Sequence, residues 1–179
     1  MTDALKVLII EDDPDIVLGC EQALQLEGIA TESVGSAEQA RRRLSRDFAG
    51  IVVSDIRLPR MDGMAFLREL MAMDRELPVV LITGHGDVSM AVQAMKDGAH
   101  DFIQKPFAPE HLVGAVRRAL EQRRLVLEVR ALRQRLDERD SLESRLIGRS
   151  AAMQQLRQML LGLASSAADV LIQGETGTG

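Results

Sequence analysis

Four short apolar runs, each ending in or followed by a polar residue, constrain the fold of this chain more than any other feature. The runs cover residues 6–10, 51–54, 79–83 and 101–103. Strands that are buried on both faces of a parallel sheet read as continuous apolar runs, so each run is a predicted central strand. In open parallel sheets ligands bind beyond the carboxyl ends of the strands, and we therefore expect the polar residues to meet there.

Amphipathic helical segments alternate with these runs. A further strand is predicted at residues 30–34, and the helix before it begins at Pro14 and ends at Gly28. Ser36 and Asp62 are suited to begin the next two helices. Strands alternating with helices predict an α/β fold with a doubly wound, five-stranded parallel sheet.

Composition limits the function classes that are open to the chain. The 179 residues carry a formal net charge of -5, with no Trp, no Tyr and four Phe, so this piece alone is not expected to bind nucleic acid. No apolar stretch reaches the roughly 20 residues that span a bilayer, and we expect a cytoplasmic protein without membrane contact. The single cysteine, Cys20, lies at helical spacing among apolar residues and is interpreted as a core thiol.

Acidic residues gather at two of the predicted strand ends. Glu11, Asp12 and Asp13 follow the first strand, and Asp55 follows the third. Carboxylates brought together in this way repel one another, and a hard cation with oxygen ligands relieves the repulsion. Mg²⁺ fits because proteins bind it through one or two carboxylates together with waters and phosphate oxygens. Asp13 has a simpler alternative role as the N-cap of the following helix.

Asp55 is the predicted nucleophile. A carboxylate can attack a phosphoryl group when a metal neutralises both partners, which yields an aspartyl phosphate. Lys105 follows the last strand and can pair with Asp55 or with phosphoryl oxygens, and Thr83 supplies a hydroxyl from the fourth strand. Each residue type is common at a strand end; their order at successive strand ends carries the inference.

Four segments make the chain resemble the receiver domains of two-component response regulators. They are residues 8–16 (LIIEDDPDI), 54–63 (SDIRLPRMDG), 81–84 (LITG) and 101–107 (DFIQKPF). The resemblance covers about the first 120 residues and implies a flavodoxin-like sheet. It also implies phosphorylation by a sensor histidine kinase.

The same resemblance implies a role for each site residue. It makes Asp55 the phosphoacceptor and implies three further Mg²⁺ ligands: Asp12 directly, Glu11 through water, and the main-chain carbonyl of Arg57. Thr83 and Lys105 are implied to contact the phosphoryl group, and Phe102 to be the switching aromatic residue. The resemblance also implies that the Lys105–Pro106 bond is cis.

The region after the last strand predicts a long helix. Residues 117–139 contain neither Gly nor Pro, and Leu125, Val129, Leu132 and Leu136 alternate spacings of four and three. This spacing is typical of a coiled coil, so we expect residues 122–145 to form a dimerising linker after a receiver domain at residues 1–121. A helix that packs on its own domain is the alternative.

The last part resembles the start of the AAA+ ATPase domain in activators of the sigma-54 factor. Residues 146–153 and 169–179 carry the resemblance, which implies ATP, sigma-54 RNA polymerase and DNA as partners of a longer protein. Gly174, Gly177 and Gly179 match a phosphate-binding loop, but the sequence stops before its Lys. We therefore expect residues 146–179 to be a truncated ATPase domain without ATP hydrolysis.

Within this class, residues 83–95 and 97–102 most resemble the group of C4-dicarboxylate transport regulators. Three other functions stay open. The first is a Mg²⁺-dependent phosphohydrolase with an aspartyl nucleophile, in which Arg57 stands where the second acid is needed. The others are a nucleotide-binding module at residues 146–179 and a dimerisation module that does not depend on phosphate. The sign of regulation by phosphorylation also stays open.

Overall fold

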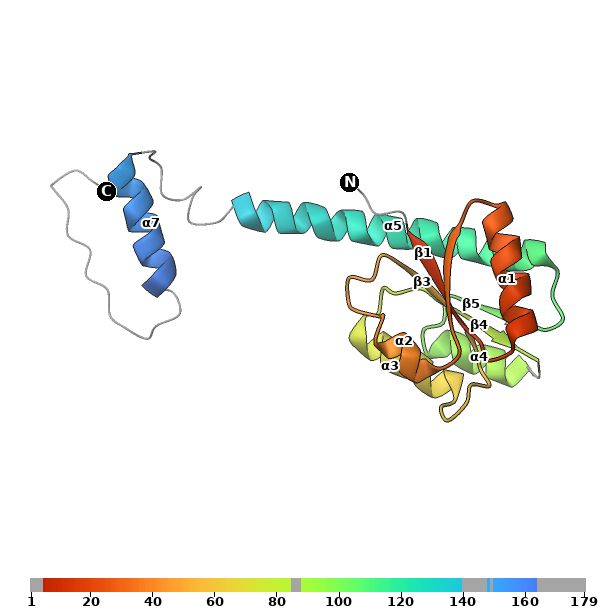
Figure 1. Cartoon of the computed structure of the whole chain (residues 1–179). Helices are drawn as coiled ribbons and strands as arrows, with labels where there is room; N and C mark the ends of the chain where they lie inside the picture. The colour runs from red at the N-terminus through yellow and green to blue at the C-terminus, as the bar shows by residue number, and fades with distance from the viewer. Residues whose placement is uncertain (1–4, 85–87, 140–147, 149, 164–179) are drawn as a thin grey trace. The chain divides into compact units, whose positions relative to one another are not determined.

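The computed structural model describes residues 5–84, 88–139, 148 and 150–163. The chain divides into two compact units, residues 1–130 and 131–179. The first unit contains a five-stranded sheet with the order β2-β1-β3-β4-β5, drawn as arrows in Figure 1. Its strands are β1 (Lys6–Ile10), β2 (Ala30–Val34), β3 (Gly50–Asp55), β4 (Val79–Thr83) and β5 (Asp101–Gln104).

Every strand pair is parallel, so all carboxyl ends lie along one edge. β3 is buried at each of its residues, as the continuous apolar run predicted. The doubly wound five-stranded α/β fold is therefore confirmed.

The first unit has five helices among its described residues. They are α1 (Pro14–Leu26), α2 (Ala37–Arg41), α3 (Gly63–Met73), α4 (Val88–Lys96) and α5 (Pro109–Arg139), of which α5 continues past residue 130. Asp13, Ser36 and Asp62 each accept a hydrogen bond from a main-chain N–H at the start of a helix. Side-chain acceptors of this kind satisfy N–H groups that have no partner within the helix.

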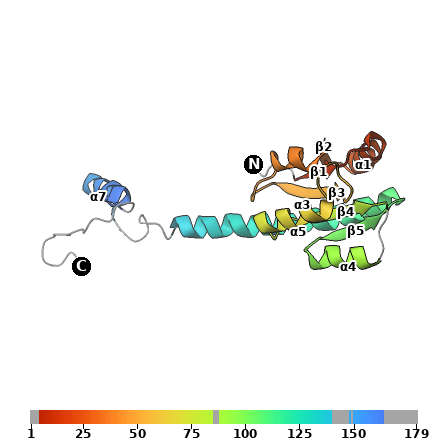
Figure 2. The same cartoon turned by 90° about the horizontal axis from the view of Figure 1, so that it is seen from below.

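Two hydrophobic cores hold the helices on opposite faces of the sheet. One core joins α1 and α5 to the strand residues Val7, Ile9, Val53 and Ile82, and it contains Cys20 as the sequence predicted. The other joins α2, α3 and α4 to the strand residues that point the opposite way, such as Leu8, Val52 and Leu81. Figure 2 is seen from the side of α2, α3 and α4, which follow one another across the sheet.

The second helix is short, with five residues. α2 ends at Arg41, and Leu44 reaches the core from the turn that follows. Arg41, Arg42 and Arg43 are exposed and form a solvated face.

The second unit contains the end of α5 and the helix α7 (Ala151–Leu163). Ser150 accepts a hydrogen bond from the N–H of Met153 at the start of α7, at 3.3 Å. Among the described residues, none of the helices combines the length and hydrophobicity that crossing a bilayer requires.

Candidate functional site

Asp55 ends β3 and lies at the carboxyl edge of the sheet, with 7% of its surface exposed. Its two carboxylate oxygens have different partners. Oδ1 accepts a hydrogen bond of 2.7 Å from the N–H of Arg57, and Oδ2 accepts one from Nζ of Lys105. The carboxylate therefore has a defined orientation before any phosphodonor arrives.

Lys105 links two of the predicted acids. Its Nζ also donates to Oε2 of Glu11 at 2.6 Å, and its main-chain N–H donates to the Thr83 carbonyl at 2.7 Å. Glu11, Thr83 and Asp55 come from the ends of three different strands, so the parallel topology brings them together with Lys105. This meeting of residues that are far apart in the sequence is what the strand-end pattern predicted.

At this edge two buried carboxylates, Glu11 and Asp55, pair with the single ammonium group of Lys105. Burial raises the pKa of Glu11 above its ordinary value; a hydrogen bond from Lys105 opposes this effect, and the charge of Asp55 reinforces it. Burial alone would lower the pKa of Lys105, but its bonds to Asp55 and Glu11 raise it. Two buried carboxylates sharing one ammonium form a site that is suited to a further cation.

The other predicted residues lie around this pair. Thr83 is 1% exposed, and Phe102 is half-buried against the core beneath α3 and α4. The Lys105–Pro106 peptide bond is cis, as the resemblance implied. The roles of Thr83 and Phe102 in switching stay predictions.

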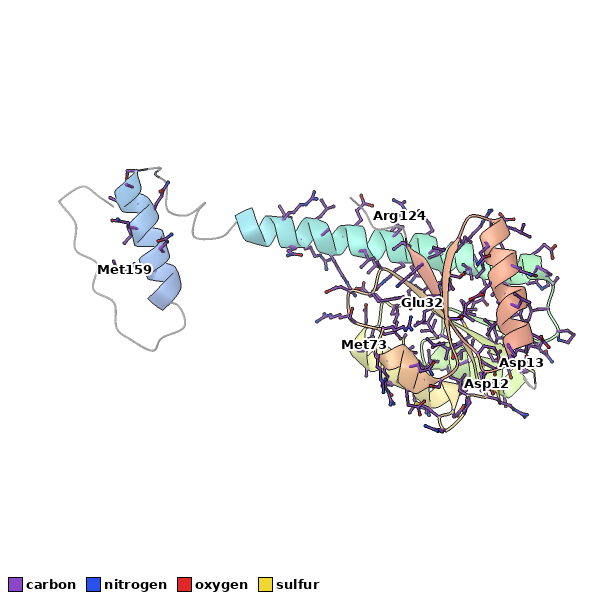
Figure 3. The ribbon with its side chains drawn as sticks, in the orientation of Figure 1. Asp12, Asp13, Glu32, Met73, Arg124 and Met159 are labelled. Atoms are coloured by element: carbon purple, nitrogen blue, oxygen red, sulfur yellow. The ribbon has the colours of Figure 1, made fainter. Side chains whose placement is uncertain are left out.

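Asp12 and Asp13 lie together at the start of α1 (Figure 3). Asp13 is the N-cap of α1, and its Oδ1 accepts from the N–H of Asp15 at 2.9 Å. Asp12 is exposed and is not used in this cap. Among the described residues, no three His, Cys, Asp or Glu side chains converge to hold a metal ion. The implied ligand set, Asp12, Asp55 and the Arg57 carbonyl, instead offers two carboxylates and a main-chain oxygen, the donor type that Mg²⁺ prefers.

An apolar hollow of about 500 Å³ lies beside Lys105. Its walls come from α1 and from the segment that joins β5 to α5, and they include Ile16, Cys20, Pro106 and Phe107. Burial raises the pKa of the Cys20 thiol to about 11, which makes it an unreactive wall residue.

Sequence reasoning missed the part that Gly63 has in this site. Gly63 begins α3, and its N–H donates to the Ile56 carbonyl at 2.7 Å. A Cβ atom at this position would lie 2.5 Å from the Asp55 carbonyl oxygen. The sequence signal for this close approach of two backbone segments was the Asp62-Gly63 pair, because glycine allows such an approach. The pair was interpreted only as the start of a helix.

Comparison with known proteins now identifies the family. The family model described as response regulator receiver domain matches residues 7–117. The chain belongs to the response regulator receiver family. It is 53% identical over 174 residues to the C4-dicarboxylate transport transcriptional regulatory protein DctD of Pseudomonas aeruginosa, a match that covers 97% of this chain and 38% of that protein.

A second relative has the same printed name. DctD of Rhizobium meliloti is 51% identical over 179 residues, which is 100% of this chain and 39% of that protein. The chain thus spans under two fifths of the length of these curated relatives. The similarity to C4-dicarboxylate transport regulators that the sequence indicated is confirmed.

Solved receiver structures share the fold. The beryllofluoride-activated NtrC4 receiver domain dimer matches with a TM-score of 0.62 and 30% identity, over 66% of this chain and 98% of that one. NtrX from Brucella abortus matches with a TM-score of 0.61 and 38% identity, over 89% of this chain and 34% of that one.

Residues 122–139 of the predicted linker lie on α5, and residues 140–145 lie outside the described residues. The side chains of Leu125, Val129, Leu132 and Leu136 are 49%, 45%, 51% and 62% exposed. The domain limits at residues 121 and 145 stay predictions. The phosphate-loop glycines Gly174, Gly177 and Gly179 lie outside the described residues.

Proposed function

We propose that Asp55 accepts a phosphoryl group from a partner histidine kinase and that this modification switches the output of the receiver domain. The observation that carries the proposal is the buried Asp55 carboxylate at the sheet edge, held on one oxygen by Arg57 and on the other by Lys105. Holding the carboxylate in one orientation favours its attack on a bound phosphoryl group.

The transfer is a substitution at phosphorus. An Asp55 oxygen forms the new P–O bond, the P–N bond to the donor histidine breaks, and the histidine nitrogen keeps the electron pair. The Lys105 ammonium then faces the new phosphoryl oxygens, and the Thr83 hydroxyl at the neighbouring strand end is the proposed second contact. Phe102 on β5, three residues before Lys105, is the proposed switching aromatic residue, which turns inward when the Thr83 hydroxyl moves toward the phosphoryl group.

Asp12, Asp55 and the Arg57 carbonyl would hold Mg²⁺, with Glu11 contributing through water. When bound, the ion neutralises negative charge on the carboxylates and the phosphoryl oxygens. The excess of buried carboxylates over ammonium groups at this edge supports the assignment.

The kinase is proposed to dock over the hollow beside Lys105. Its apolar wall on α1 and the following Pro106–Phe107 turn offers contact area directly next to the phosphoacceptor. This arrangement would let a protein partner place its phosphohistidine near Asp55 while excluding water.

Intact-protein mass spectrometry after incubation with acetyl phosphate and Mg²⁺ tests the chemistry. We expect one phosphoryl adduct on the parent chain, none on Asp55→Asn and none with chelator. Asp13→Asn is the matched control, because this neighbouring carboxylate caps α1 and should not be needed. An adduct that persists in Asp55→Asn would overturn the assignment.

The proposed output is control of an attached sigma-54 activator ATPase, and hence of transcription, in a cytoplasmic homodimer. The support is similarity to relatives named as transcriptional regulators and the exposed apolar seam on α5, namely Leu125, Val129, Leu132 and Leu136. Leu125 and Leu132 take d positions of the heptad and Val129 takes an a position. This combination favours a two-stranded coiled coil. Sedimentation of Leu132→Glu, compared with Arg124→Glu, tests the seam: dissociation is expected from the first variant only.

A further inference from the structure

Arg123 on α5 is fully buried, which is unusual for a charged side chain. Its guanidinium donates to the Phe48 carbonyl at 2.9 and 3.1 Å and to the carbonyls of Arg46 and Glu76 at 3.1 and 3.2 Å. It also donates to Oδ2 of Asp74 at 2.8 Å. The charge and all the donor nitrogens of the guanidinium are thus matched inside the protein.

Arg130, two turns further along α5, binds the same carboxylate. It donates to Asp74 Oδ1 at 2.6 Å and Oδ2 at 3.0 Å. It also reaches Oε2 of Glu76 at 2.7 Å and the Arg46 carbonyl at 2.9 Å. Asp74 therefore receives two guanidinium groups from one helix.

Asp74 is well placed for this role. It follows the last residue of α3, is 4% exposed, and its own N–H donates to the Leu70 carbonyl at 2.8 Å. Burial alone would raise its pKa, but hydrogen bonds from Arg130, the Glu76 N–H and Arg123 lower it to about 2. The carboxylate thus stays charged at physiological pH.

This cluster lies at the sheet edge opposite the phosphoacceptor. Its acceptors come from the segments that precede β3 and β4, whereas Asp55 is the last residue of β3 and Lys105 follows the last residue of β5. α5 begins close to Lys105, packs along the sheet through Leu112, Ala115, Val116 and Ala119, and reaches the cluster with Arg123. The helix is consequently fixed to the domain near both edges of the sheet.

The cluster also determines which side of α5 faces outward. Arg123 and Arg130 are seven residues apart and share one side of the helix, and at about 100° per residue the seam of Leu125, Val129 and Leu132 falls on the opposite side. The seam side chains are each about half exposed, in agreement with this geometry.

We infer that Asp74, through Arg123 and Arg130, is a positioning residue that anchors α5 to the receiver domain and presents the apolar seam outward. A buried ion pair contributes little net stability compared with apolar packing, because desolvation offsets the Coulomb attraction. What the planar guanidinium forks add is geometry: two turns of one helix are held in a single orientation.

Hydrogen exchange of the full chain, measured by mass spectrometry, tests the anchor. Peptides that cover residues 120–130 of Asp74→Asn should exchange roughly tenfold faster or more than those of the parent, while peptides of β1, β3 and α1 keep their rates. All chains carry Leu132→Glu, so that dimer formation cannot protect the helix. Glu128→Gln is the matched control, since it removes an exposed carboxylate on α5 itself, within the same peptides, and should leave exchange unchanged.

A second variant keeps the test decisive if Asp74→Asn does not fold. Arg130→Gln leaves the Arg123–Asp74 pair in place, so the domain should stay folded and accept phosphate from acetyl phosphate. Faster exchange limited to residues 126–134 would support the anchor. Unchanged exchange there would overturn it, as would faster exchange spread evenly over the whole domain, which indicates a general loss of stability.

Discussion

The main chain of Gly63 lies directly against that of Asp55. A Cβ atom on Gly63 would stand 2.5 Å from the Asp55 carbonyl oxygen and 2.7 Å from Cα of Ile56. Both are backbone atoms, so Gly63→Ala must move α3 or the end of β3. We expect a loss of about 1–3 kcal/mol in the free energy of unfolding and slower phosphorylation of Asp55.

Urea unfolding and a time course with acetyl phosphate measure these two effects. Gly19→Ala is the control, because the space around Gly19 is open and alanine favours the helix. If Gly63→Ala is as stable and as reactive as the parent, the close approach does not position Asp55.

Removing the Lys105 ammonium should strengthen Mg²⁺ binding. Glu11 and Asp55 share this cation, and Lys105→Met leaves both carboxylates facing the proposed metal site. We expect the dissociation constant for Mg²⁺ to fall roughly tenfold at low salt. Isothermal titration calorimetry measures it, with the exposed Lys96→Met as control. Weaker binding by Lys105→Met would place the metal elsewhere.

Arg60 occupies a backbone conformation that glycine tolerates better. Its φ of 68° lies in the left-handed region, which costs an ordinary residue about 1–2 kcal/mol. Arg60→Gly relieves this cost but also raises the conformational entropy of the unfolded chain, which opposes the gain. We expect the free energy of unfolding to rise by about 1 kcal/mol or less. Thermal and urea unfolding test this. Arg42→Gly, at a position with φ of -71°, should destabilise instead.

Asp74 makes the free energy of unfolding depend on pH in the acid range. Its pKa falls from 3.8 to about 2 on folding, so its contribution is complete above the unfolded-state pKa and is lost as pH falls through the folded-state value. The contribution amounts to at most about 2 kcal/mol. The stability difference between the parent and Asp74→Asn should therefore be constant from pH 7 to pH 5 and shrink below pH 4, as measured by urea unfolding. A constant difference down to pH 3 would contradict the assignment.

Charges beside the seam predict a parallel dimer. In the heptad set by Leu125 and Val129, Glu128 takes a g position and Arg133 takes the e position five residues later, which face each other between parallel helices. Glu128→Arg should weaken the dimer roughly fivefold, and adding Arg133→Glu should restore it. Sedimentation equilibrium measures both. Failure of the double variant to recover would indicate another orientation.

Local patterns in the sequence were sufficient for the fold and for much of the site. Buried parallel strands require continuous apolar runs, and parallel strands place their carboxyl ends along one edge; Glu11, Asp55, Thr83 and Lys105 therefore had to approach one another once the strand order was known. The helix starts at Asp13, Ser36 and Asp62 also followed from the sequence, because a capping bond involves neighbours in the chain.

Contacts between distant segments needed the tertiary structure. Arg123 continues the spacing of Leu112, Ala115, Val116 and Ala119, yet nothing in that spacing says that an arginine there is buried. Only the fold supplies its partners, since Phe48, Asp74 and Glu76 belong to loops that the sheet order brings under α5. Periodicity along a helix determines which residues share a side, whereas the layer packed against that side determines whether a charge can be buried there.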